Sequence, residues 1–352
     1  MKNTDLKKWR NNRPASMFSK TKRWADNPVG AFERFLEFAY FGQPMFNLFI
    51  GNRRDLEQIM HMSKSVNTIE SNENLIFLDK VRVELYENFI QLDTGHILNS
   101  RLAPNAIFSG EHWNLIRDIR KSKVASLQIG TFYPIAKQKY FYHFLVEDLP
   151  EIISMNQSDL DITFVTLKGQ SKFVLELCEI AGVKVEILNT KIQLFERLVV
   201  PTYSRVNSKW SIDKLMLLKK GVDYDQPNVK KLLLLRKGKV RSDEDFERSL
   251  YDFLEPFGYK VIDPDEYSNQ EQIKIFSKAS EIVAIHGAAL ANLVFSNTEC
   301  RIFEIFNHPY RMYVFRDLAK LNGNAYTSAE VDSAFSTLKT WLDGPAVQKG
   351  NL

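Results

Sequence analysis

The sequence is poor in cysteine and has no long apolar run. Its 352 residues include two cysteines, Cys178 and Cys300, whose spacing fits neither a disulfide framework nor a paired metal site. We therefore expect two buried thiols in a reducing compartment. Apolar runs such as residues 232–235 are far shorter than the ~20 residues of a membrane-spanning helix. The N-terminus has no apolar stretch followed by a small-residue cleavage site, so we expect no secretory signal and a cytoplasmic location.

Positive charge is concentrated in the first 24 residues. They contain eight Lys or Arg and one acid, Asp5, which leaves the rest of the chain slightly acidic. Trp9, Phe18 and Trp24 alternate with these charges, a mixture typical of a segment that lies on the inner face of an anionic membrane or binds an anionic partner. A solvated tail is the alternative. No recognition helix or aromatic RNA platform stands out, so we expect no nucleic-acid partner.

The chain is long enough for two domains. After an amphipathic helix at 29–40, short β-rich runs between residues 75 and 108 predict a strand meander. From residue 124 onward strands alternate with helices, and a second such series begins at residue 231. This alternation predicts an α/β protein with parallel sheets.

The polar stretch 221–228 separates the two series and predicts the domain boundary. We expect a basic leader (1–28), an N-terminal domain (29–222), a C-terminal domain (223–326) and a closing helical segment (327–352) that could cross back onto the first domain.

Small residues follow a buried strand in the second domain. In an open parallel sheet, ligands bind beyond the carboxyl ends of the strands. The strand pattern 281–285 ends at His286, and Gly287, Ala288 and Ala289 then open a helix. Small residues let an anion approach the free N–H groups of a helix start. The pattern predicts a diphosphate cradle, and a tight turn in which these residues merely pack well is the alternative.

Arg236 and Glu304 belong to two further strands of that domain. The planar guanidinium of Arg236 suits phosphate oxygens, although a charge run after a strand is usually a solvated turn. Glu304 interrupts an apolar strand and could accept hydrogen bonds from both hydroxyls of a ribose; an ion pair with Arg301 or Arg311 is the alternative. A cradle, a cation and a hydroxyl acceptor together indicate a nucleotide site.

The first domain offers His143 and Glu147, which are i, i+4 neighbours on a predicted helix. A histidine beside a carboxylate can act as a general base, and a surface pair that stabilises the helix is the alternative. No second histidine supplies a metal spacing here, and Pro264 makes the acidic pair Asp263 and Asp265 a turn. We therefore expect no metal site.

With these residues assembled, the second half of the chain resembles glycosyltransferase family 61. The resemblance rests on an ordered series: Arg236 and Arg241 after a strand, Glu271 and Gln272 in a helix begun by Ser268, the run from His286 to Asn292, and Glu304 in the next strand. The segment 142–150 also resembles a first-domain stretch of the family. The resemblance covers about residues 231–326, and residues 1 to about 120 show none.

The resemblance implies a GT-B-like architecture, in which two Rossmann-like domains face each other across a cleft. It also implies an inverting mechanism, a nucleotide-sugar donor such as a UDP-sugar, and no obligatory metal or cofactor. The first domain then belongs to the acceptor and the second to the donor. The expected donor-binding residues are Arg236, Arg241, Gln272, His286, Gly287, Ala288, Ala289, Asn292 and Glu304. His143, Glu147 and Asp148 become candidates for the catalytic base, and the resemblance does not choose among them.

These features predict an enzyme that adds a sugar to a glycan or lipid-linked glycan in capsular or lipopolysaccharide synthesis. A nucleotide-sugar epimerase on the same scaffold is one alternative, and an inactive scaffold subunit of a polysaccharide assembly complex is another. The sequence leaves open the sugar, the nucleotide, the acceptor, the linkage and the oligomeric state.

Overall fold

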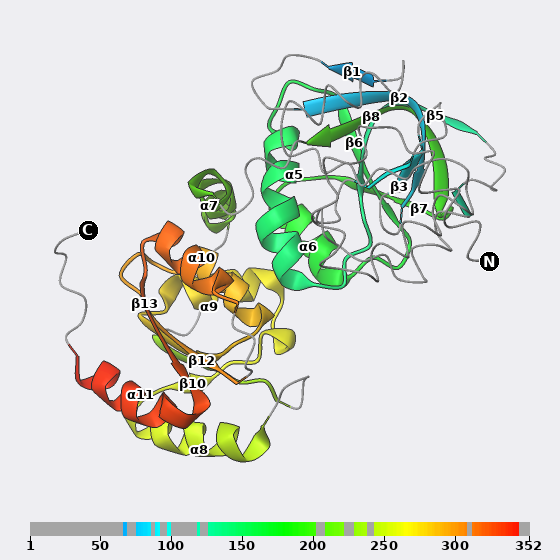
Figure 1. The fold of residues 1–352 in the computed structure, drawn as a ribbon. Coiled ribbons are helices and arrows are strands. Elements are labelled where there is room, and N and C mark those ends of the chain that lie inside the picture. Colours follow the sequence, from blue (N-terminus) through cyan, green and yellow to red (C-terminus); the bar gives the residue numbers. More distant parts are fainter. Residues whose placement is uncertain are drawn as a thin grey trace, which may run out of the picture.

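The structure, a computed structural model, describes residues 66–68, 75–85, 89–91, 97–99, 118–119, 126–201, 208–221, 229–237, 243–307 and 312–344. These residues form two lobes, each built on a β-sheet, with helices lying between the sheets (Figure 1). The basic leader, the helix expected at 29–40 and most of the boundary expected at 221–228 lie outside the described residues. The fold is mixed α/β, as the sequence predicts.

The first sheet has a parallel half and an antiparallel half. Its strands are β1 (Val66–Thr68), β2 (Leu75–Glu84), β3 (Phe89–Gln91), β4 (Ile97–Asn99), β5 (Leu127–Ile135), β6 (Ile162–Leu167), β7 (Val185–Leu188) and β8 (Ile192–Pro201). Strands β8, β5, β6 and β7 are parallel neighbours, whereas β2 pairs antiparallel with β1, β3 and β8, and β3 with β4. The expected meander is confirmed in β2, β3 and β4, and its first strand is long.

Helices cover one face of the first sheet. They are the π-helix η2 (His143–Asp148), α5 (Leu149–Asn156) and α6 (Lys172–Ile180). Phe77 and Phe164 belong to the core that these helices share, while Phe132, Phe195 and Leu198 belong to a second cluster, to which no helix in the described part of the chain contributes. The parallel half of the sheet therefore has the expected α/β form, whereas β2, β3 and β4 add an antiparallel half with no helix between its strands.

The second sheet is parallel throughout, with the order β10-β9-β11-β12-β13. Its strands are β9 (Lys231–Leu234), β10 (Lys260–Val261), β11 (Glu281–Ile285), β12 (Arg301–Phe306) and β13 (Ala325–Glu330). Counted along the chain, the spatial order is 2-1-3-4-5, a doubly wound sheet whose strand order reverses between β9 and β11. Ligands bind beyond the strand ends at such a reversal.

Alternate residues of the second sheet face two helical layers, as strand geometry requires. Leu232 and Ile282 pack with α9 (Asn269–Lys278), the 3-10 helix η7 (Ala288–Phe295) and α10 (Val314–Asn322). Their neighbours Leu233 and Val283 pack with α8 (Glu244–Leu254) and α11 (Ala334–Asp343). Short helical turns complete the lobe: η5 (Glu255–Phe257), η6 (Pro264–Glu266) and η8 (Val331–Ser333).

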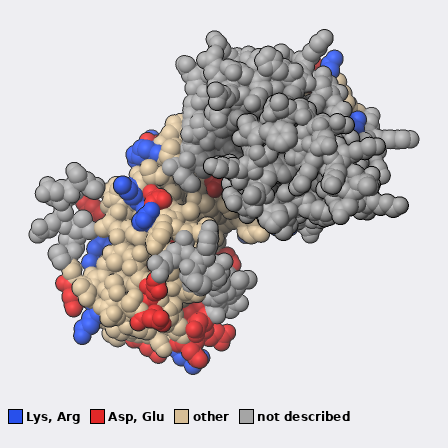
Figure 2. Space-filling view, viewed as in Figure 1, with Lys and Arg blue, Asp and Glu red and all other residues tan. Residues whose placement is uncertain are grey.

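The closing helix α11 packs on the second sheet. Phe335 packs against Phe246 of α8, and the Arg301 guanidinium lies 4.3 Å from the centre of the Trp341 ring. These contacts bury the apolar side of α11 where it leaves β13. On the outside of this layer, acidic side chains gather at the end of the lobe where Figure 1 places α8 (Figure 2).

One hydrophobic core runs through both lobes. The connecting helix α7 (Lys209–Met216), which continues into η4 (Leu217–Gly221), packs against η2 and α5 on one side and against η7 and α10 on the other. Ile212 and Leu215 of α7 are fully buried in this core. Cys178 and Cys300 are free and buried, as expected, and burial raises the pKa of each to about 12.

A carboxylate of the first lobe caps a helix of the second. Ser268 and Glu271 form the predicted capping box at the start of α9. The next residue, Asn269, donates from its backbone N–H (3.2 Å) and its side-chain amide (2.6 Å) to Oε2 of Glu176 in α6. Burial would raise the pKa of Glu176, but the hydrogen bonds from Asn269 and the ion pair with Lys172 outweigh burial and lower the pKa. Glu176 therefore ties α6 to α9 through its charged form.

Replacement of Glu176 by Gln is expected to lower the free energy of unfolding by about 1 kcal/mol at pH 7, because a charged hydrogen bond becomes a neutral one. Since the folded-state pKa is depressed, this contribution is complete above the unfolded pKa, about 4.3, and is lost as the pH falls through the folded value. Urea unfolding at pH 7 and at successively lower pH measures it. The exposed Glu179→Gln on the same helix is the control, and a difference that persists undiminished in acid would contradict the assignment.

Candidate functional site

Arg236, His286 and Gly287 meet at the reversal point of the second sheet. Arg236 lies two residues beyond β9, and its Nη1 donates to the carbonyl oxygen of His286, which follows β11, at 3.2 Å. A Cβ on Gly287 would lie 2.1 Å from this Nη1 and 3.3 Å from the Arg236 Cζ. Gly287 has extended backbone angles, so glycine is required here by the close passage of Arg236 and not by backbone strain. The strand ends that we predicted separately are thus in contact.

The turn after Gly287 is tighter than expected. We predicted an α-helix, but η7 is a 3-10 helix whose first hydrogen bond runs from Leu290 N to Gly287 O (3.0 Å). Its residues from Leu290 onward are buried among α7, α9 and α10, and the narrower helix fits this space. The N–H groups of Gly287, Ala288 and Ala289 precede its first hydrogen bond, the position at which helix starts bind anions.

Gln272 and Asn292 support this turn from behind. Asn292 Nδ2 donates to Gln272 Oε1 (2.9 Å) and to Ala289 O (3.3 Å), and Gln272 Nε2 donates to the carbonyls of Pro264 (2.8 Å) and Tyr267 (3.1 Å). Both side chains are buried. The structure therefore places these two expected donor-binding residues in the scaffold of the turn.

Glu304 lies inside the sheet and not at its edge. It is the fourth residue of β12 and is 0% exposed. One carboxylate oxygen contacts His286 Nδ1 at 2.5 Å, and the other accepts a hydrogen bond from the Tyr326 hydroxyl of β13. Both oxygens therefore have partners within the protein, and Arg301 pairs with Glu281 at 2.5 Å and not with Glu304. Arg311 lies outside the described residues.

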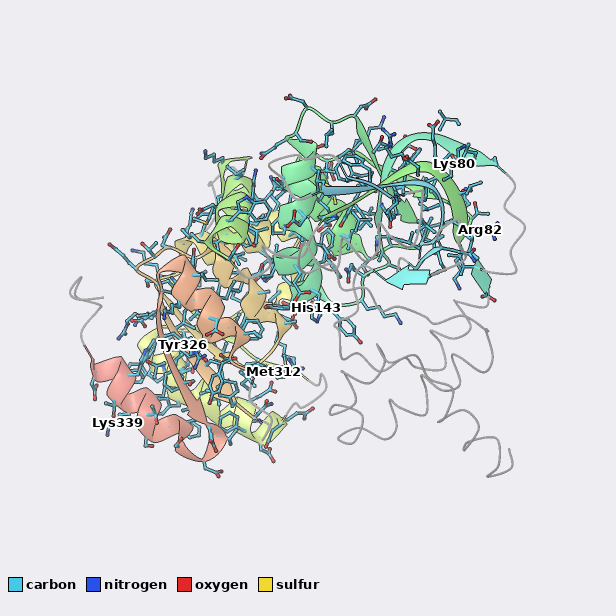
Figure 3. All side chains as sticks on the ribbon, turned by 45° about the horizontal axis from the view of Figure 1, so that its top comes forward. Lys80, Arg82, His143, Met312, Tyr326 and Lys339 are labelled. Carbon is cyan, nitrogen blue, oxygen red and sulfur yellow. The ribbon has the colours of Figure 1, made fainter. Side chains whose placement is uncertain are left out.

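Aromatic rings connect this site to the first lobe. The Phe315 ring of α10 lies 5.3 Å from the His286 ring and 5.6 Å from the Tyr142 ring. Tyr142 in turn contacts His143 edge-on at 5.4 Å. Figure 3 shows His143 at the junction of the two lobes. Phe315, which the sequence did not indicate, thus links the His286 site of the second lobe to the His143 helix of the first lobe through ring contacts.

His143 and Glu147 form a pair on the π-helix. His143 Nδ1 lies 2.8 Å from Glu147 Oε2, and the side chains are 53% and 22% exposed. Asp148, in contrast, is buried and accepts a hydrogen bond from Gln138 Nε2. Pi-helical turns are rare and often occur at functional sites. The structure therefore separates Asp148 from the two residues that can reach a ligand.

Three further expectations concern Arg241, metal binding and membrane-spanning helices. Arg241 lies outside the described residues. Where the structure describes side chains, no group of three His, Cys, Asp or Glu is close enough to hold a metal ion. Within the same part of the chain, no helix has the length and apolar character needed to cross a membrane.

Comparison with known proteins identifies the matched region. The family model described as Glycosyltransferase 61 matches residues 141–303, which run from the start of the His143 helix to Phe303 in β12. No curated protein matches the chain. Residues 141–303 therefore match glycosyltransferase family 61, and this match indicates a glycosyltransferase.

Proposed function

We propose that the enzyme transfers a sugar, with inversion, from a nucleotide-sugar to a hydroxyl group of a glycan, in a GT-B-like arrangement of its two lobes. The observation that carries this proposal is the contact of Arg236 with His286 and Gly287 at the reversal point of the parallel sheet. The ring contacts through Phe315 support a shared site with His143. Donor and acceptor groups then belong to different lobes.

On the donor side, Arg236 and the N–H groups of Gly287, Ala288 and Ala289 bind the diphosphate. When the bond between the anomeric carbon and the phosphate oxygen breaks, that oxygen keeps the electron pair and gains negative charge. A guanidinium and fixed N–H dipoles stabilise such charge without reorganisation. They supply the positive charge that a metal provides in other transferases, so we propose that no metal is needed.

On the acceptor side, Glu147 and His143 remove the proton. The acceptor hydroxyl attacks the anomeric carbon from the face opposite the diphosphate, and its proton passes either to the Glu147 carboxylate or to Nε2 of His143. In the second case Nδ1–H donates to Glu147, which holds the imidazole in the correct tautomer. Burial of Asp148 against Gln138 argues against that residue as the base.

The setting follows from the basic first 24 residues, which we propose to hold the enzyme at the inner face of an anionic membrane. A lipid-linked or surface polysaccharide is the matching acceptor class. Binding of wild-type protein and of a variant lacking residues 1–24 to vesicles with and without anionic lipid tests this step.

Incubation with a panel of nucleotide-sugars, with and without EDTA, tests the function. Transfer to glycoside acceptors with inverted anomeric configuration, unchanged by EDTA, is the expected result, and NMR of the product reads the configuration. Conversion of the donor to its epimer without an acceptor would identify an epimerase instead. Folded protein that neither binds nor turns over any donor would leave only the scaffold role.

Gly287→Ala is expected to weaken nucleotide diphosphate binding about tenfold or more, because the new Cβ cannot coexist with Arg236 Nη1 at 2.1 Å and displaces a charged donor. Isothermal titration with UDP and other nucleoside diphosphates measures this change. Gly344→Ala is the control, since its Cβ would meet backbone oxygens at 3.4 Å and 3.5 Å. Equal affinities for the two variants would show that Arg236 does not contact the ligand from its present position.

A further inference from the structure

Tyr326 and Glu304 extend the His286 site into the interior of the sheet. We propose that these two are positioning residues, which fix the His286 imidazole with Nδ1–H toward Glu304 so that Nε2 contacts the donor diphosphate. The identity of the ligand rests on the proposed function, whereas the orientation of the ring does not. Both residues lie beyond Phe303, where the family match ends.

The Glu304 carboxylate is enclosed within the protein. It is 0% exposed in a strand whose other side chains are also buried. A buried carboxylate is costly unless its oxygens are hydrogen-bonded. Glu304 meets this requirement with two partners, His286 on one oxygen and Tyr326 on the other. Because a carboxylate only accepts, both partners donate to it, and Nδ1 of His286 carries a hydrogen.

The hydroxyl of Tyr326 reaches Glu304 from the neighbouring strand. Tyr326 pairs with Ile302 in the parallel register of β13 and β12, two residues before the position opposite Glu304, so both side chains lie on the same face. Burial and the adjacent Glu304 carboxylate raise the pKa of the Tyr326 phenol far above its usual range. The raised pKa favours the protonated phenol, which donates to Glu304.

The His286 imidazole packs against two aromatic rings. Its ring lies 5.3 Å from the Phe306 ring, at an interplanar angle of 31°, and 5.3 Å from the Phe315 ring, at 58°. The side chain is 11% exposed. Rings on two sides and a carboxylate at Nδ1 restrict rotation, so a polar contact between this ring and a ligand is made by Nε2. The His286 carbonyl is held by Arg236, which places the ring beside the proposed diphosphate site.

Tyr326→Phe removes one hydroxyl and tests this arrangement. Solution NMR of protein with 15N-labelled histidine reads the tautomer of His286, whose signals the His286→Gln variant assigns among the six histidines. We expect the wild-type ring to be protonated at Nδ1. In Tyr326→Phe the 15N chemical shifts of this ring should change, and UDP, GDP or dTDP should bind about three- to tenfold more weakly.

Tyr259→Phe is the matched control. Its hydroxyl donates to Glu281 Oε2 at 2.6 Å in the same sheet, away from His286. A merely structural role for Tyr326 predicts that both Phe variants lose similar stability and leave His286 unchanged, which would overturn the proposal. A wild-type ring protonated at Nε2 alone would also overturn it. If wild-type protein binds none of the nucleotides, the proposed function fails, while the histidine spectrum still decides the positioning role.

Discussion

Arg236→Ala is expected to reduce kcat/KM for the nucleotide-sugar by about 100- to 1000-fold, the usual loss when one preorganised donor to a developing negative charge is removed. The guanidinium lies at the reversal point of the second sheet, with Nη1 on the His286 carbonyl. From there its other N–H groups can contact phosphate oxygens beside the start of η7. Because charge on the leaving oxygen grows in the transition state, kcat should fall more than donor affinity.

Steady-state transfer rates and titration with the matching nucleoside diphosphate separate these two effects. Arg236→Lys retains a charge but loses the planar fork, so its activity should lie between those of wild type and Arg236→Ala. Arg248→Ala, an exposed position on α8, is the control for loss of one positive charge. If Arg236→Ala is as active as Arg248→Ala, Arg236 has no role at the diphosphate.

Buried parallel strands were the easiest part of the fold to predict. Residues 281–285 and 301–306 coincide with β11 and β12, because strands covered on both faces are nearly continuous apolar runs. The capping box of Ser268 and Glu271 was likewise readable, since it depends on residues three apart. At the start of helix α8, Asp243 accepts the capping hydrogen bond from Phe246 N.

Features that depend on distant residues were not predictable. Strand β13 carries little apolar periodicity, and it forms because Ala325–Glu330 pairs with the whole of β12. The placement of α11 depends on contacts with Phe246 and Arg301, which are far away in sequence. A short stretch of sequence therefore predicts neither strand β13 nor the side of the sheet that α11 covers.

The candidate site shows the same division. Arg236 and His286 could be predicted as strand ends, and parallel topology brings strand ends together. The position of Glu304 in the middle of its strand gave no sign of its partners, because Tyr326 and His286 reach it from two other segments. The burial of Asp148 was equally hidden, since it depends on Gln138 ten residues earlier.

Glu147→Gln is expected to lower kcat by about two to four orders of magnitude, the usual contribution of a general base, with donor affinity unchanged. Gln keeps the shape of the side chain and can still accept from His143 Nδ1, but it cannot take a proton and it removes the charge that supports a protonated imidazole. Either route for the acceptor proton is therefore blocked. Transfer assays at saturating donor, with nucleotide titration alongside, measure the two parts of the expectation.

His143→Gln distinguishes the two routes. If Glu147 is the base, His143→Gln keeps the carboxylate and loses far less activity than Glu147→Gln; if His143 Nε2 is the base, both variants lose comparable activity. Asp148→Asn should chiefly reduce stability, because Asp148 is buried against Gln138, and the exposed Glu186→Gln on β7 controls for loss of one carboxylate. Wild-type transfer by both Glu147→Gln and His143→Gln would remove this pair from the reaction.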